Sequence, residues 1–217
     1  MKKISFIAIM LVCGMTIFAQ AVKDRNIIPV AVNLNQVLRM NITNGGNIEF
    51  VFNTIADYKS GIGAGADAIY LTSFEVASST RWALDFGAET ANLIGNDNPA
   101  NLLDINNVGL SLNNLGSHKF GAAAAAIGTG ATELFSAPTT NATKTIALPI
   151  YPTTLITDNK VAAANAGDAV DNKFTINWRC GTKEGSMNGT ALIDQKPSPA
   201  PDRYVVNVLF DLSAILI

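Results

Sequence analysis

Charged residues, histidine and cysteine are all scarce in this sequence, and each scarcity excludes a class of protein. Only 15% of the 217 residues are charged, and no run of Lys and Arg forms the basic stripe that nucleic acid requires. Of the two cysteines, Cys13 lies in an apolar N-terminal segment, so Cys180 could form no intrachain disulfide in a processed chain. Stability is therefore expected to come from an apolar core alone.

The single histidine, His118, leaves little room for catalysis or metal binding. A Ser-His-Asp triad would have to use it, but its neighbours, residues 116–119, form no nucleophile elbow. One histidine also rules out the usual zinc sites with several histidines. We therefore expect His118 to lie in an exposed turn, and we predict no catalytic residue, no metal site and no cofactor.

Oxygen-rich side chains could still react or bind. Glu75 and Asp85 would lie opposite each other if the strands around them formed a hairpin, and carboxylates about 5 to 9 Å apart are what glycoside hydrolysis needs. A solvated sheet face explains this pair more simply.

Residues 96–98 and 168–172 could contribute to a calcium site, which needs about six to eight oxygen ligands. Asx-turns account for both clusters with fewer assumptions.

The N-terminus has the layout of a secretory signal peptide. Two lysines precede an apolar run that ends at Ala19, and small residues offer cleavage after this alanine or after Ala21. We therefore expect residues 1–19 to be a signal peptide and residues 20–217 to be a mature, single-domain chain, secreted or placed on the cell surface. Removing the two lysines leaves 13 of the 15 Lys and Arg against 17 Asp and Glu, a formal charge of −4. No membrane span is predicted in the mature chain.

The mature chain is rich in Asn, Thr, Ala and Gly with β-branched and aromatic residues interspersed, a mixture that favours strands and turns over helices. Apolar and polar side chains alternate over residues 37–53 on both sides of Asn44-Gly45-Gly46, which predicts a β-hairpin. Residues 71–86 predict a second hairpin that turns at residues 78–80. Its alternation places five apolar side chains on one face: Phe74, Val76, Trp82, Leu84 and Phe86.

Four further segments have the character of strands: residues 102–112, 145–151, 173–180 and 204–216. Cys180 shares a strand face with Phe174, Ile176 and Trp178, so we expect it to be a small buried hydrophobe. Residues 121–131, with five consecutive alanines, predict a short helix or a loop, and residues 159–172 a long connection.

The number and spacing of these strands set the fold class. Seven or more short alternating strands with frequent turns predict an all-β, single-domain antiparallel β-sandwich, either Ig-like or jelly-roll. Trp82 and Trp178 lie on the apolar faces of their strands, which favours core positions over a sugar-stacking platform.

Both ends of the mature chain carry alternating apolar side chains. At the start they are Ile28, Val30, Val32 and Leu34, and Pro29 among them suits an edge strand. At the C-terminus they are Tyr204, Val206, Val208, Phe210 and Leu212. Either these strands complete the subunit's own sheets, or one of them pairs with the edge of a neighbouring subunit and fills a groove there.

Three segments resemble small exported β-sandwich proteins of Bacteroidetes-type bacteria: Phe18-Ala19-Gln20, Leu84-Asp85-Phe86-Gly87 and the closing Pro201-Asp202-Arg203-Tyr204-Val205-Val206-Asn207-Val208. The last segment is also similar to the final strand of spore-coat-U and fimbrial-type sandwiches. The resemblance implies an Ig-like sandwich with a surface or filament role, and it implies no catalytic residue.

The sequence therefore favours a non-enzymatic structural or adhesive subunit of a cell-surface or extracellular filament. Such a subunit would self-associate through edge-strand pairing of a terminal strand, and its partners would be identical subunits. The alternative is a secreted carbohydrate- or surface-binding module. A hydrolase that uses Glu75 and Asp85 comes third.

Overall fold

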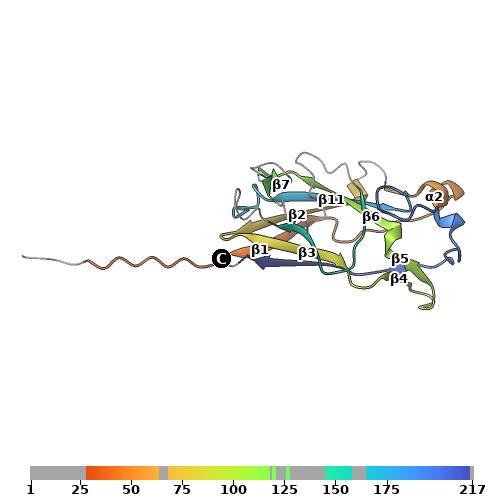
Figure 1. Cartoon of the computed structure of the whole chain (residues 1–217), viewed down its shortest axis with the longest axis horizontal. Helices are drawn as coiled ribbons and strands as arrows, with labels where there is room; N and C mark the ends of the chain where they lie inside the picture. The colour runs from red at the N-terminus through yellow and green to blue at the C-terminus, as the bar shows by residue number, and fades with distance from the viewer. Residues whose placement is uncertain are drawn as a thin grey trace, which may run out of the picture. The chain divides into compact units, whose positions relative to one another are not determined.

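The computed structural model describes residues 28–63, 68–117, 119–120, 126–127, 145–157 and 165–215. The chain divides into two units, Met1–Leu34 and Asn35–Ile217. In the first unit, the described residues 28–34 form no helix or strand and are exposed. The second unit holds every described strand (Figure 1).

Of the described strands, all but β7 (Lys119–Phe120) and β8 (Ala126–Ile127) form three antiparallel sheets. The five-stranded sheet has the order β1 (Leu38–Asn44), β2 (Leu71–Ser78), β11 (Lys173–Cys180), β6 (Val108–Asn114) and β9 (Ile146–Ala147). The β3 sheet has the order β10 (Thr153–Thr157), β3 (Trp82–Ala88) and β13 (Val208–Ala214). The β4 sheet has the order β12 (Tyr204–Val205), β4 (Asn92–Gly95) and β5 (Leu102–Asp104).

The remaining elements are short. The two-residue strands β7 and β8 pair in parallel. One α-helix, α2 (Ile55–Ser60), and the 3-10 helices η1 (Ala68–Tyr70), η2 (Ile105–Asn107) and η3 (Leu192–Asp194) complete the described chain. Within these ranges, every helix is too short to cross a bilayer.

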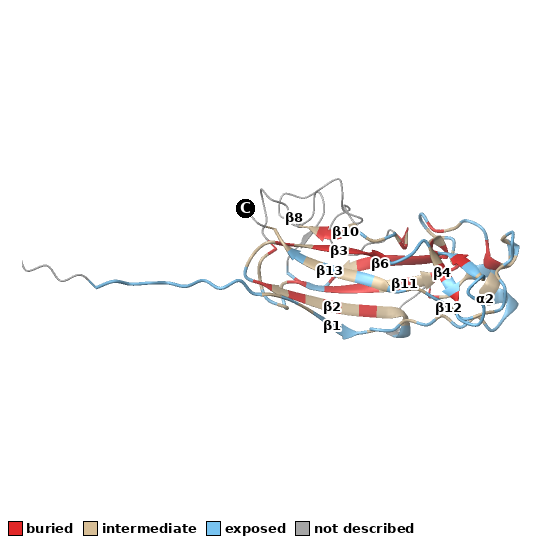
Figure 2. Ribbon diagram, turned by 90° about the horizontal axis from the view of Figure 1, so that it is seen from below, coloured by how far each residue is buried: buried red, intermediate tan, exposed pale blue. Residues whose placement is uncertain are grey.

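The core lies between the five-stranded sheet and the β3 sheet, where the buried residues gather (Figure 2). Aromatic rings contact each other across this interface: Trp82 lies 6.2 Å from Phe174, and Phe86 lies 6.0 Å from Trp178, between ring centroids. Both tryptophans occupy core positions, as predicted. The predicted all-β antiparallel sandwich is therefore confirmed.

Successive strands β2 and β3 do not pair with each other. β2 pairs with β1 and β11, whereas β3 pairs with β10 and β13, so the chain crosses from one sheet to the other at residues 79–81. The hairpin predicted over residues 71–86 is wrong. Its apolar face is confirmed, because one strand in each sheet turns its alternating side chains toward the shared core. All five predicted side chains have no exposed surface: Phe74, Val76, Trp82, Leu84 and Phe86.

The hairpin predicted over residues 37–53 is also wrong. β1 pairs with β2 up to Asn44, and Gly45 then turns the chain away with a φ of 68°. A Cβ on Gly45 would lie 1.9 Å from the carbonyl oxygen of Leu71, so only glycine fits this turn. Residues 47–52 keep the two-residue alternation of burial, but they belong to no sheet in the described chain.

Other boundaries differ for local reasons. The run predicted over residues 102–112 is broken by η2, because the Asp104 carboxylate accepts a hydrogen bond from the Asn106 backbone N–H at 3.0 Å. The C-terminal run divides into β12 and β13, since the chain changes its partner from β4 to β3 there. β11 has the predicted bounds. Apart from β8, the predicted segment 121–131 lies outside the described residues, as does the first part of 159–172.

The buried Asn165 ties the start of β3 to a connection that the sequence left without a structural role. Its side-chain Oδ1 accepts from the Trp82 backbone N–H at 2.9 Å, and its Nδ2 donates to the Trp82 carbonyl at 2.8 Å. The Trp82 indole N–H donates to the Asn165 carbonyl at 2.8 Å. The amide side chain thus replaces a strand partner where β3 begins.

Replacing Asn165 by alanine should destabilise the fold by about 2 to 4 kcal/mol, because it leaves the buried N–H and C=O of Trp82 without partners. Urea denaturation followed by tryptophan fluorescence measures the change. Asn41→Ala is the matched control, since its exposed side chain makes only a 3.3 Å bond to Glu75. A loss for Asn165→Ala no larger than that of the control would contradict this role.

Candidate functional site: an apolar groove between two unpaired edges

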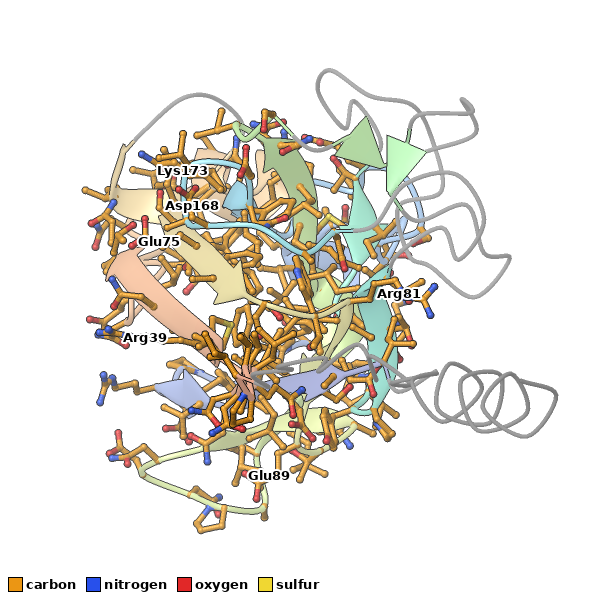
Figure 3. The ribbon with its side chains drawn as sticks, turned by 90° about the vertical axis from the view of Figure 1, so that its left-hand side faces the viewer. Arg39, Glu75, Arg81, Glu89, Asp168 and Lys173 are labelled. Carbon is orange, nitrogen blue, oxygen red and sulfur yellow. The ribbon has the colours of Figure 1, made fainter. Side chains whose placement is uncertain are left out.

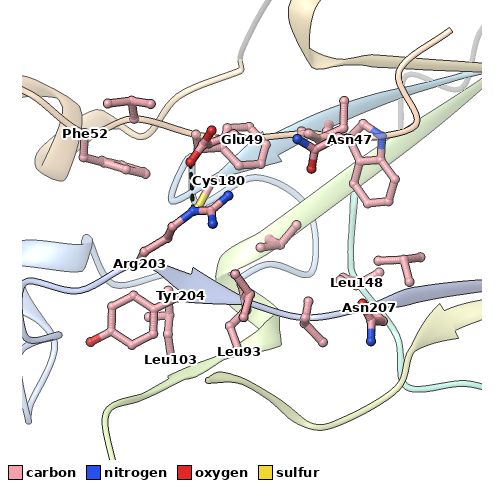
Figure 4. A pocket seen from close by; sticks show the side chains of 18 of the residues that line it. Asn47, Glu49, Phe52, Leu93, Leu103, Leu148, Cys180, Arg203, Tyr204 and Asn207 are labelled. Atoms are coloured by element: carbon pink, nitrogen blue, oxygen red, sulfur yellow. Dashed lines mark hydrogen bonds and ion pairs between the residues drawn. The ribbon is translucent and has the colours of Figure 1, made fainter. Parts of the chain in front are cut away.

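A groove of about 720 Å³ opens beside the sandwich core (Figure 4). Its first wall is residues 47–52, which follow β1 and the Gly45 turn. Its second wall is residues 199–208, which include β12 and enter β13. The floor consists of buried apolar side chains: Leu93, Leu103, Val108, Leu148, Trp178, Cys180 and Leu192.

The first wall presents alternating side chains on an unpaired backbone. Ile48, Phe50 and Phe52 are half-buried, whereas Glu49 and Val51 are exposed. Phe50 stacks on Tyr70 with ring centroids 5.0 Å apart, which fixes the wall against η1. Within the described chain, the backbone of residues 47–52 makes no hydrogen bond. Its N–H and C=O groups therefore remain available to another strand.

The second wall is a sheet edge. β12 pairs with β4 alone and β13 with β3 alone among the described strands, so each has one side without a strand partner. Val206, Val208 and Phe210 are half-buried and line the groove. The groove thus has a strand-like segment on each side and apolar side chains beneath.

The floor offers no reactive group. Burial raises the pKa of the Cys180 thiol to about 12, so it stays protonated at neutral pH and behaves as the buried hydrophobe that the sequence predicted. Within the described residues no cluster of His, Cys, Asp and Glu could hold a metal ion. The groove can therefore exclude water from apolar side chains and pair with a backbone.

A carboxylate fixes each wall at one end. The Asp57 side chain of α2 accepts from the backbone N–H groups of Asn53 and Thr54 at 2.9 and 2.8 Å, where the first wall ends. These bonds, with Thr54 as the largest contributor, hold the pKa of Asp57 below its usual value. The capping box that they complete starts α2.

Asp202 does the same for the second wall. Its carboxylate accepts from the backbone N–H groups of Asp97, Asn98 and Arg203 and from the Asn101 side-chain amide, at 2.7 to 3.2 Å. The Asp97 N–H contributes most to keeping the pKa of Asp202 below 3.8. The wall and the loop between β4 and β5 are thus joined through one side chain.

One ion pair joins the two walls. The Arg203 Nε donates to Glu49 Oε1 at 3.1 Å, and the dashed line in Figure 4 crosses from one wall to the other. Arg203 and Glu49 are 61% and 54% exposed, so solvent screens the attraction between them. The pair connects the two walls across the groove.

The predicted assembly residues fall into two groups. The N-terminal residues Ile28, Val30, Val32 and Leu34 are 76 to 90% exposed and belong to no described strand. Of the C-terminal residues, Tyr204, Val206, Val208 and Phe210 line the groove, and Leu212 continues their half-buried face along β13.

The other candidate groups are not brought together. Glu75 lies on β2 beside its cross-strand neighbour Lys173 (Figure 3), whereas Asp85 lies on β3 and accepts from the Thr154 hydroxyl at 2.8 Å. The two carboxylates face outward from different sheets, so the facing pair predicted from a hairpin is wrong. His118 lies outside the described residues.

The oxygen-rich clusters form the predicted Asx-turns. Asn98 Oδ1 accepts from the Ala100 N–H at 3.0 Å, and Asp168 Oδ1 accepts from the Val170 N–H at 2.8 Å.

Sequence reasoning missed the first wall of the groove, because the alternation of residues 47–52 suggested a hairpin strand. The partnership of Glu49 and Arg203, 154 residues apart, had no sequence signal.

The Asp202→Asn variant should be less stable at neutral pH, because one carbonyl oxygen replaces two acceptors. The folded-state pKa of Asp202 is lowered, so its contribution is complete above the unfolded-state value of about 3.8 and is lost as pH falls through the folded-state value. Thermal unfolding from about pH 2 to about pH 7, a range that brackets that value, should show the difference in stability between variant and parent closing in acid.

Asp194→Asn is the control for this variant, since Asp194 is exposed and its side chain makes no hydrogen bond or ion pair within the described residues. Its stability at neutral pH should match that of the parent, because the substitution removes no side-chain bond. A gap for Asp202→Asn that stays constant down to pH 2, well below the carboxyl's range, would show that the carboxylate does not act through its charge.

Comparison with known proteins adds no family to this geometry: no family model and no curated protein matches the chain.

Proposed function

We propose that this protein is a non-enzymatic structural subunit that assembles with copies of itself by strand addition at the groove. The observation that carries the proposal is the apolar floor flanked by two strand-like walls with unpaired backbone. A β-strand with apolar side chains on one face satisfies both parts of such a site, because its backbone pairs with a wall and its side chains cover the floor.

The occupant is the N-terminal segment of a second copy. Residues 28–34 carry four apolar side chains on alternate positions, no charge, and no hydrogen bond within the described chain. Seven extended residues span about 23 Å, which is comparable to the roughly 20 Å of the six-residue first wall. Burying each valine or isoleucine contributes about 1.5 to 3 kcal/mol before ordering costs.

The C-terminal strand is a poor donor because it already completes its own subunit. β13 pairs with β3 over seven registered residues, from Val208 opposite Ala88 to Ala214 opposite Trp82. Phe210 also packs at 5.0 Å from Phe86 and at 5.8 Å from Phe74 in the core. Removing this strand would expose the core, so the N-terminal segment is the one free to be exchanged.

A donor on one copy and an acceptor on the next make a head-to-tail contact. Such contacts build filaments when they do not close into a ring. The predicted signal peptide and the scarcity of charge suit assembly outside the cell or at its surface, and they support a structural or adhesive role. We propose no catalytic step for the groove.

The Val30→Asp, Val32→Asp double variant of residues 20–217 should lose self-assembly. Seating two carboxylates on an apolar floor costs several kcal/mol, so association should weaken by at least about 100-fold. Ala31→Asp, Asn33→Asp is the matched control, because it adds the same charge on the opposite face of the same segment. Sedimentation velocity and negative-stain electron microscopy measure the assemblies.

Filaments or large oligomers are expected for the parent and the control, and monomers for the double variant. Equal assembly of the parent and both variants would refute the N-terminal donor. A parent chain that stays monomeric at high concentration would refute the proposed function itself.

A further inference from the structure

We infer that the Glu49–Arg203 ion pair is a latch that holds the two walls of the groove together in the free subunit and must open before a strand from another copy enters. The inference rests on the proposed function and concerns the regulation of the same site. It starts from the position of the pair, which among the described residues is the one ion pair that connects the two walls.

Both ends of the latch stand on anchored backbone. The Arg203 N–H is held by Asp202, whose carboxylate also binds the loop after β4. Glu49 lies on a wall whose next residue, Phe50, stacks on Tyr70, and whose far end is fixed by Asp57. When the two side chains meet, they therefore join two segments that other contacts already position, and the pair adds a weak link between the walls.

Between these anchors, the first wall can move away from the second wall. Residues 47–52 make no backbone hydrogen bond in the described ranges, so separating the walls breaks no ladder. The apolar side chains beneath, such as Leu93 and Leu103, resist the opening because it wets them. A donor strand reverses that cost, since it covers the floor again and pairs with the exposed edge.

The latch is weak because solvent surrounds both of its side chains. Both side chains are more than half exposed, and exposed ion pairs of this kind change an equilibrium by about two- to fivefold. The pair therefore shifts the equilibrium between closed and open walls toward the closed state. It lowers the apparent affinity and the entry rate of the donor by up to about the same factor. The pair therefore delays uptake of a strand without preventing it, and an uncovered sheet edge is protected meanwhile.

Strand uptake is tested with a synthetic peptide of residues 26–37 and the full mature chain that carries Val30→Asp and Val32→Asp, which cannot supply its own donor. In that background, Glu49→Gln and Arg203→Gln each remove the latch. The double change Glu49→Arg, Arg203→Glu restores an ion pair with reversed signs. Glu75→Gln is the matched control, because it makes the same chemical change on the outer face of β2. Fluorescence anisotropy of the labelled peptide gives the rates.

At low ionic strength, the two single variants should take up the peptide about two- to fivefold faster than the background chain, while the reversed pair and Glu75→Gln should match that chain. High ionic strength should raise the background rate to that of the single variants, because salt screens exposed charges. Uptake at one rate in every variant, or a reversed pair as fast as the single variants, would overturn the latch while leaving the groove as the acceptor. Absence of uptake in all variants would overturn the proposed function and the latch with it.

Discussion

The structure depends on the burial of one alternating apolar face from each of two sheets. β2 and β11 supply Phe74 and Phe174 from one side, β3 supplies Trp82 and Phe86 from the other, and their rings contact one another in the middle. With a single buried cysteine and no disulfide in the described chain, this contact is the main source of stability. Because β2 and β3 follow each other along the chain but belong to different sheets, one continuous segment contributes to both sides of the core.

The same constraint explains why a groove exists. Five strands face three, and the outermost strands, β1 and β13, approach each other without pairing. Beyond β1 the chain continues as a wall that is held by side chains, through the aromatic stack of Phe50 and the Asp57 carboxylate, and not by a ladder. The apolar floor of the groove is therefore flanked by the two walls and accessible between them. A sheet edge in this state is a template for another strand.

The sequence correctly predicted which side chains are buried, because burial follows from the two-residue alternation. It did not predict which strands pair with one another. Two-residue alternation correctly identified the core positions of Phe74, Trp82 and Phe86, because period alone decides which face is buried. It could not distinguish a hairpin from a crossing between sheets, since both bring the same side chains to one core. The turn at Gly45 looked like a hairpin turn, but the close approach to Leu71 that fixes its direction involves a residue 26 positions away. The alternation from Tyr204 to Phe210 correctly predicts a strand edge. The wall opposite carries the same alternation over residues 47–52, but the sequence assigns it to a hairpin with β1, whereas it belongs to no sheet in the described chain.

The pairing of distant segments also sets how this chain folds. β11 lies between β2 and β6, and the partners Phe74 and Phe174 are a hundred positions apart, so the central strand of the large sheet arrives late in the chain. Loop closure on that scale must occur before the core contacts compensate for it, which places such topologies among the slow folders. During synthesis, the apolar faces of β2 and β6 would therefore stay exposed until β11, about a hundred residues after β2, has been made.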